Sequence, residues 1–200
     1  MPDAVERLLS LAQRNAVNRE LLTCLPTLEL PDCYLVSGCL FQTVWNLLCG
    51  RPPDAGILDY DIFYYDSSDL SWDAEDAVIR RVKRAFPDLP GEIQVRNQAR
   101  VHLWYQDRFG RDIAPLQSSR DGIDHFLVQA SCVGVRCVGG APQVYAPFGF
   151  EDLFSMVLRP NPRRDLPDVY YRKARRWTEL WPALQILPWP GARAMAASSM

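Results

Sequence analysis

Residues 58–65, Leu-Asp-Tyr-Asp-Ile-Phe-Tyr-Tyr, constrain the fold more than any other stretch of the chain. Aromatic and branched side chains of this kind are typical of a buried strand. Because side chains alternate along a strand, Asp59 and Asp61 must point to one face, about 7 Å apart, while Tyr60 and Ile62 point to the other. An isolated Asp-x-Asp is usually an acidic surface turn. At the start of an apolar strand, however, the pair favours a site for Mg²⁺, which prefers oxygen ligands.

A glycine turn precedes this strand. Residues 33–36 form a short apolar run that ends at Ser37-Gly38, and residues 41–48 then follow a helical pattern. Glycine permits a tight turn and a close approach of the backbone, and the N–H groups at the start of a helix suit a triphosphate. The order of strand, glycine turn, helix and acidic strand therefore indicates metal-assisted phosphoryl transfer.

The remaining pattern predicts an α+β fold, with a small mixed sheet flanked by helices and a helical C-terminal third. Helices are expected over residues 4–22, over 72–86 after a Ser71 N-cap, from Ser118 or Ser119 to 127, and over 149–158 and 167–180, with strands over 92–105, near Ile113 and over 132–138. We expect a docking helix in residues 1–30, a core in 31–145, a helical extension in 146–190 and a flexible tail in 191–200.

Composition narrows the class of protein. A length of 200 residues suits one domain, and a net charge of −2 argues against coating nucleic acid by overall charge. No stretch reads as a membrane span or a signal peptide, so we expect a cytoplasmic protein. The six cysteines form no Cys-x-x-Cys pair and are interpreted as small buried apolar residues.

Basic residues concentrate in the C-terminal third. Seven of them lie between positions 159 and 176 (159, 163, 164, 172, 173, 175 and 176), against two acidic ones, 165 and 168. Two interpretations stay open: a solvated helix face, or a basic wall over the cleft that holds a triphosphate or a nucleic-acid acceptor. The tryptophans at 177, 181 and 189 are expected to pack the C-terminal segment against the domain.

The run Ser37-Gly-Cys-Leu-Phe-Gln-Thr-Val-Trp-Asn-Leu-Leu-Cys-Gly50, followed by Asp59-Tyr-Asp-Ile-Phe-Tyr-Tyr-Asp66, resembles the polymerase-β-type nucleotidyltransferase superfamily, including the head domain of CCA-adding enzymes. More narrowly, the chain is similar, from about residue 30 to 190, to a bacterial nucleotidyltransferase-like family without an assigned substrate. The similarity is carried by Gln42-Thr-Val-Trp-Asn46, Asn97-Gln-Ala-Arg-Val-His-Leu-Trp-Tyr105 and Arg159-Pro-Asn-Pro162.

The resemblance implies transfer of a nucleoside monophosphate from a nucleoside triphosphate to a hydroxyl acceptor, with Mg²⁺ or Mn²⁺ as the metal. Asp59 and Asp61 would bind the metal, and a third carboxylate is expected on the neighbouring strand, where Glu92 is the candidate. The resemblance places an acid at Gln94, so an inactive fold that binds a nucleotide or a protein is the alternative. The acceptor stays open between RNA, a protein and a small molecule.

The same resemblance suggests which residues hold the nucleotide. Ser37, Gly38 and Gln42 are expected beside the triphosphate. Arg96 and Arg100, on the expected strand 92–105, are candidates for binding phosphate or acceptor, because the arginine fork matches phosphate oxygens. Their alternative role is as structural partners of nearby aspartates.

Overall fold

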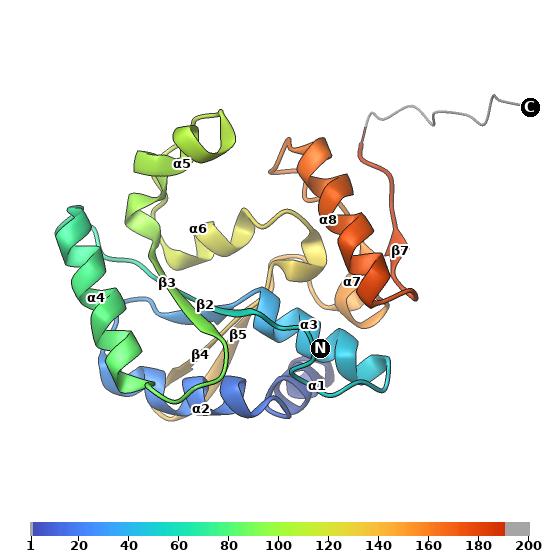
Figure 1. The fold of residues 1–200 in the computed structure, drawn as a ribbon, viewed down its shortest axis with the longest axis horizontal. Coiled ribbons are helices and arrows are strands. Elements are labelled where there is room, and N and C mark those ends of the chain that lie inside the picture. The colour runs from blue at the N-terminus through green and yellow to red at the C-terminus, as the bar shows by residue number, and fades with distance from the viewer. Residues whose placement is uncertain (1, 191–200) are drawn as a thin grey trace, which may run out of the picture.

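The computed structural model describes residues 2–190; the tail expected at 191–200 lies outside them. Figure 1 shows a sheet with helices around it. The helices are α1 (Pro2–Ala12), α2 (Ala16–Cys24), α3 (Gly38–Leu48), α4 (Trp72–Ala85), α5 (Val101–Phe109), α6 (Ser119–Asp124), α7 (Glu151–Phe154) and α8 (Pro167–Leu180), with 3₁₀ turns η1 (Leu25–Leu28), η2 (Gln98–Arg100) and η3 (Gln129–Ser131). The strands are β1 (Tyr34–Val36), β2 (Asp59–Tyr64), β3 (Glu92–Asn97), β4 (Gly134–Val138), β5 (Ala141–Tyr145), β6 (Val157–Leu158) and β7 (Gln185–Ile186).

The five-stranded sheet has the order β3-β2-β1-β4-β5. Only β2 and β3 run parallel, and the other neighbours are antiparallel, so the sheet is mixed, as the sequence predicts. Its two faces differ. Leu35, Ile62 and Val95 share one face and join the main core with α1, α2 and α3. Tyr34 and Val36 point to the opposite face and pack against α6. The acidic pair of β2 belongs to this second face.

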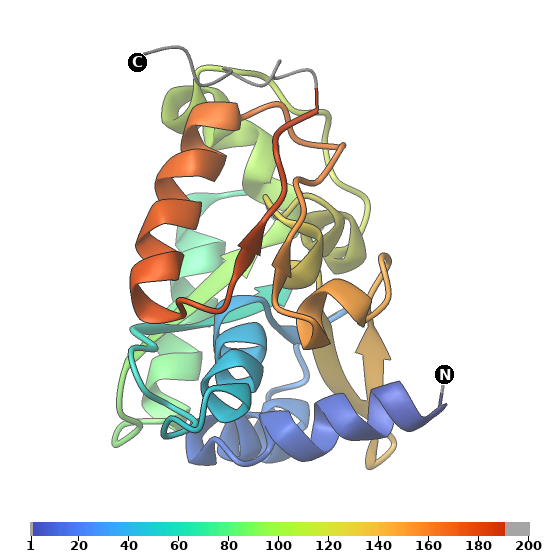
Figure 2. The ribbon, with the colours of Figure 1, turned by 90° about the vertical axis from the view of Figure 1, so that its right-hand side faces the viewer.

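The C-terminal helix α8 is fixed to α3 by aromatic side chains. Trp177 packs edge-on against Phe41 and Trp45, at 5.4 and 6.0 Å between ring centroids. Trp181 donates a hydrogen bond from its indole N–H to the Asn46 side chain at 2.9 Å. Figures 1 and 2 show the result, with α8 lying over α3. The expected packing role of Trp177 and Trp181 is confirmed, and Trp45 and Asn46 of α3 form the surface that they contact.

The single helix expected over residues 4–22 is wrong, because the chain breaks at Asn15. The Asn15 side-chain oxygen accepts from the backbone N–H of Val17 at 3.0 Å and caps α2. Its amide nitrogen donates to the Thr43 hydroxyl at 3.1 Å. This buried side chain therefore ends α1 and ties α2 to α3, which propensity along one segment does not reveal.

The long strand expected over residues 92–105 is also wrong. It ends at Asn97, whose side-chain oxygen accepts from the backbone N–H groups of Ala99 at 3.1 Å and Asp66 at 3.0 Å. This cap turns the chain into η2 and α5, so Arg100 and His102 lie on helical backbone. The expected hairpin strand near Ile113 does not form either.

In the second half of the chain, one further expectation fails and one strand forms that was not expected. The helix expected over 149–158 is only the short α7, followed by β6, which pairs in parallel with β7. A hairpin strand, β5, follows β4 after Gly139 and Gly140, both with positive φ. The N-caps expected at Ser71 and Ser118 are confirmed by hydrogen bonds to Ala74 and Asp121.

Candidate active site

One face of the sheet gathers the polar residues singled out by the sequence. Asp59 and Asp61 alternate with the buried Tyr60 and Ile62 along β2, as predicted. In the parallel register of β2 and β3, Asp59 lies opposite Glu92, Asp61 opposite Gln94 and Phe63 opposite Arg96. The structure thus brings the aspartates, Glu92, Gln94 and Arg96 to a single face, and this face carries the candidate site.

The turn between β1 and α3 adjoins the acidic pair. The helix α3 begins at Gly38 itself. A Cβ atom placed on Gly38 would lie 3.0 Å from the Gln42 amide nitrogen and 3.9 Å from an Asp59 carboxylate oxygen. The missing side chain therefore lets the backbone of the turn approach Gln42 and Asp59 closely. Ser37, Gly38, Gln42 and Asp59 form one neighbourhood, as the sequence predicts.

Ser37 has an unusual backbone conformation, with φ 54° and ψ −114°. Its N–H donates to the Val133 carbonyl at 2.9 Å, and its carbonyl accepts from Leu40 at 2.9 Å, so both neighbouring elements hold it in place. Its side chain makes no capping hydrogen bond to α3. Non-glycine residues at positive φ carry strain of about 1–3 kcal/mol, and such residues cluster where a ligand is clamped.

Replacing Ser37 with glycine is expected to raise the free energy of unfolding by about 1 kcal/mol, because glycine adopts this conformation without strain. Urea denaturation of the ligand-free protein measures the change. Ser37→Ala is the matched control, since it removes the hydroxyl but keeps the strained Cβ, and it should bring no gain. A glycine variant no more stable than the alanine variant would contradict the strain.

Electrostatics at the pair are unbalanced. Burial and the neighbouring Asp59 charge raise the pKa of Asp61 to about 7, with a further small contribution from Glu92, while Lys173 and Arg96 oppose the rise. Among residues 2–190, neither aspartate forms an ion pair within 4.0 Å. The hydrogen bond that Asp59 accepts comes from the neutral Gln94 amide, at 3.3 Å. Within residues 2–190, the two close carboxylates therefore have no ion-paired partner, and Lys173 and Arg96 offset their charge only in part.

This donor set fits a hard divalent cation. Mg²⁺ is commonly bound by one or two carboxylates, with water and substrate phosphate completing its shell. Asp59 and Asp61 supply two carboxylates on one strand face, and a cation would remove the repulsion that raises the Asp61 pKa. Asp59 and Asp61 are thus the residues that would hold such an ion.

The third carboxylate is less well placed. Glu92 stands opposite Asp59 in the register, but its side chain is exposed at the start of β3. Within the described part of the chain, no three acidic, histidine or cysteine side chains gather closely enough to hold a metal ion. Gln94, not Glu92, contacts the pair directly.

The two arginines expected near the site have different surroundings. Arg96 lies on the site face, and its guanidinium donates to the adjacent Val95 carbonyl at 3.3 Å. Arg100 lies away from this face, buried and paired with Glu75, and it also donates to the Leu70 carbonyl at 2.9 Å. Arg96 is therefore free to meet a ligand, whereas Arg100 holds the fold together.

Two cavities flank the acidic pair along β2. The first, of about 340 Å³, lies at the Asp59 end between α3 and α8, and its lining includes Gln42, Arg176 and Glu179. The second, of about 600 Å³, lies at the other end and includes Phe63 and Arg96. Helix α8 contributes to both. The sequence contains an excess of basic residues over positions 159–176, but only the fold shows that some of these residues face the two cavities.

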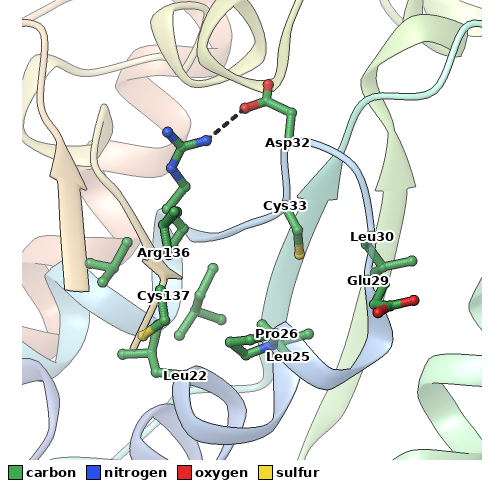
Figure 3. A pocket seen from close by; sticks show the side chains of 13 residues that line it. Leu22, Leu25, Pro26, Glu29, Leu30, Asp32, Cys33, Arg136 and Cys137 are labelled. Atoms are coloured by element: carbon green, nitrogen blue, oxygen red, sulfur yellow. Dashed lines mark hydrogen bonds and ion pairs between the residues drawn. The ribbon is translucent and has the colours of Figure 1, made fainter. Parts of the chain in front are cut away.

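A third cavity, of about 290 Å³, lies away from the site, between α2, η1, β1 and β4 (Figure 3). Leu35 and Val135 line it, and both side chains point to the sheet face opposite the acidic pair. An ion pair between Arg136 and Asp32, 3.2 Å long, spans its rim. Cys33, which also lines it, has its pKa raised to about 12 by burial and by Asp32, which disfavours the nucleophilic thiolate.

The cysteines carry no metal site or disulfide. All six are free thiols. Cys39 and Cys132 are buried as expected, whereas Cys49 is exposed. None of the helices within residues 2–190 is long and apolar enough to cross a membrane.

Comparison with known proteins agrees with the fold. A solved NMR structure described as revealing "a CCA-adding enzyme head domain" matches with a TM-score of 0.74 and 23% identity, over 92% of this chain and 96% of that chain. At this identity the likeness shows a shared fold. No protein of curated function matches the sequence. A family model described as "Nucleotidyltransferase" matches residues 23–186, a span that includes β1, α3, the acidic strand and α8. The chain therefore belongs to this nucleotidyltransferase family, with the polymerase-β-like fold that its sequence predicts.

Proposed function

We propose that the protein transfers a nucleoside monophosphate from a nucleoside triphosphate to a hydroxyl acceptor, with Mg²⁺ or Mn²⁺ bound by Asp59 and Asp61. One observation carries the proposal: two carboxylates that form no ion pair within residues 2–190 lie beside the strained turn that starts α3. A carboxylate pair alone repels phosphate, and a divalent cation alone would not fix the orientation of the phosphate. Together, pair, cation and turn suit a triphosphate.

The acceptor hydroxyl oxygen forms a bond to the α-phosphorus, the α–β phosphoanhydride bond breaks, pyrophosphate leaves and the hydroxyl proton passes to solvent. A bound divalent cation would neutralise charge on the phosphate oxygens. The Ser37-Gly38 backbone and Gln42 would orient the triphosphate, and Arg176 would add a positive charge from α8. Arg96 lies on the same sheet face at the other end of the pair, opposite Phe63 in the register.

A second candidate function rests on Gln94. Its amide occupies the register position opposite Asp61 and hydrogen-bonds Asp59, where a neutral group cannot add the charge of a third carboxylate. The alternative is therefore a catalytically inactive fold that binds a nucleotide or a protein partner. Glu92, exposed beside Asp59, is the remaining acid that could take the third position.

The test is thermal unfolding with each nucleoside triphosphate, with and without Mg²⁺. A ligand at about a hundred times its dissociation constant should stabilise the native state by roughly 2.7 kcal/mol. We expect this gain for at least one nucleotide, only with Mg²⁺, and not in Asp59→Asn/Asp61→Asn. Asp88→Asn, an exposed site beyond α4, is the matched control and should keep the full gain.

Each outcome separates the two functions. A gain that survives in the double variant, or that needs no Mg²⁺, supports nucleotide binding without the proposed metal site. No gain with any nucleotide excludes both nucleotide transfer and nucleotide binding, and leaves a protein partner as the remaining function.

A further inference from the structure

We propose that the cavity bounded by α5, α6 and α8 binds the acceptor, and that the acceptor is a small phosphorylated molecule with a flat or apolar body. This inference rests on the proposed nucleotidyl transfer. It goes further by assigning the second substrate to a place and to a chemical class.

The position of the cavity follows from the direction of the reaction. Attacking and leaving oxygens lie roughly in line across the α-phosphorus, so the acceptor and the departing pyrophosphate occupy opposite sides. The Ser37-Gly38 turn sits at the Asp59 end of the acidic pair. Phe63, two residues beyond Asp61 on the same strand face, opens into the larger cavity at the other end. The acceptor therefore approaches from the Phe63 side.

The charge of this cavity is entirely positive. Its lining holds five basic side chains and no aspartate or glutamate: Arg96, Arg108, Arg164, Arg172 and Lys173. Within residues 2–190, none of the five forms an ion pair. Arg96 and Lys173 also act on the charge of the acidic pair, but the cations outnumber these two carboxylates. Such an excess of positive charge favours an anionic ligand, and the arginine fork matches phosphate.

Arg164 shows how firmly this charge is held. Its guanidinium lies over the rings of Tyr105 and Phe109, 5.1 and 5.3 Å from their centroids, and donates to the Tyr105 hydroxyl. Its Nε atom is buried without a hydrogen-bond partner among the described residues. Aromatic stacking thus keeps in place a cation with an unused donor.

Apolar groups complete the lining. Phe126 stacks on Phe63 at 5.4 Å between centroids, with 19° between the ring planes. Trp104, Leu116 and Leu127 add further apolar surface. Mostly apolar walls with a few charged groups, and a volume of about 600 Å³, are typical of a site for one small molecule. A polynucleotide needs a groove that continues along its backbone.

The test compares three arginines of α8 by calorimetric titration. Arg172 lines the acceptor cavity, Arg176 lines the cavity at Asp59, and the exposed Arg175 lines neither. The probes are phenyl phosphate, phenol, inorganic phosphate, an eight-nucleotide oligoadenylate, and the Mg²⁺ complex of the nucleoside triphosphate that most stabilises the wild type. All three variants are glutamine substitutions at exposed positions, so folding should be preserved.

We expect phenyl phosphate to bind more tightly than phenol or inorganic phosphate and without competing with the nucleotide. Arg172→Gln should weaken phenyl phosphate roughly tenfold, the loss of one charge-assisted hydrogen bond, and leave nucleotide affinity unchanged. Arg108→Gln should repeat this effect from α5. Arg176→Gln should weaken the binding of the nucleotide alone. Arg175→Gln should weaken the binding of neither the nucleotide nor phenyl phosphate.

Three results would overturn the inference while leaving the proposed function intact. The first is nucleotide binding without any phenyl phosphate binding, and the second is competition between the nucleotide and phenyl phosphate. The third is an oligoadenylate affinity that depends on Arg172 and exceeds the affinity for phenyl phosphate. The second would make the cavity a nucleotide pocket, and the third would make the acceptor a polynucleotide. Absence of nucleotide binding to the wild type would instead reject the proposed function itself.

Discussion

Asp61→Asn is expected to stabilise the protein at pH 8 in the absence of divalent cations, by up to about 4 kcal/mol. The native pKa of Asp61 is about 7, raised by burial and by the Asp59 charge, against an ordinary value of 3.8. A raised pKa means that the native state binds this proton more tightly than the unfolded chain does. Wild-type stability therefore falls as the pH rises from about 4 to about 7, and asparagine removes that loss.

The measurement is the free energy of unfolding in urea from pH 4 to pH 9, in chelator. The advantage of Asp61→Asn should be small near pH 4, grow through pH 7 and then level off. Asp88→Asn, an exposed carboxylate, should track the wild type throughout. Adding Mg²⁺ at pH 8 should stabilise the wild type but not the variant. A difference independent of pH, or a destabilised variant at pH 8, would show that the Asp61 carboxyl is not desolvated.

The placement of Asp59 and Asp61 on one strand face could be predicted from the sequence, for a local reason. The alternation Asp59-Tyr60-Asp61-Ile62 depends on local strand geometry, and the structure keeps it unchanged. The Ser37-Gly38 turn is equally local, because glycine acts through its own missing side chain. The N-caps at Ser71 and Ser118 likewise follow from local pattern.

The roles of residues that act across long separations in the sequence could not be predicted from the sequence. Asn15 and Asn97 cap the segments that follow them, and hydrogen bonds with Thr43 and Asp66, 28 and 31 positions away, tie these side chains to other elements. The charge of Lys173 acts on Asp61 because Trp177 and Trp181 fix α8 on α3. Periodicity describes one segment at a time, so it cannot show which distant segment will cover a site.

Arg100 is the clearest case of a side chain whose role depends on a distant partner, and loss of that partner is expected to have a large effect on the free energy of unfolding. The sequence makes Arg100 a candidate for binding phosphate or acceptor, with a structural ion pair to a nearby aspartate as the alternative, and the structure pairs it with Glu75, which is 2% exposed. Glu75 also accepts from the backbone N–H of Asn97 at 2.8 Å. One carboxylate of α4 thus fixes both the end of β3 and the start of the helical segment that bounds the proposed acceptor cavity.

Glu75→Gln is expected to lower the free energy of unfolding by about 3–5 kcal/mol, because it leaves the Arg100 charge buried without a partner. Asp76→Asn on the same helix is the control. It breaks the exposed ion pair with Arg80, at 2.9 Å, and should cost under about 1 kcal/mol. The measurement is urea unfolding of both variants and of Glu75→Gln/Arg100→Met.

The double variant decides what the pair does. If Arg100 serves the fold, removing its charge together with that of Glu75 should cost clearly less than the sum of the single changes, since no uncompensated charge then remains. Additive costs would mean that the two side chains act independently. A stable double variant that lost nucleotide affinity would instead return Arg100 to the binding site. Arg96 stands one residue before Asn97 on β3, so the hydrogen bond of Glu75 also positions the arginine that faces the ligand. The affinity for nucleotide or phenyl phosphate should therefore weaken only in proportion to the displacement of this strand end.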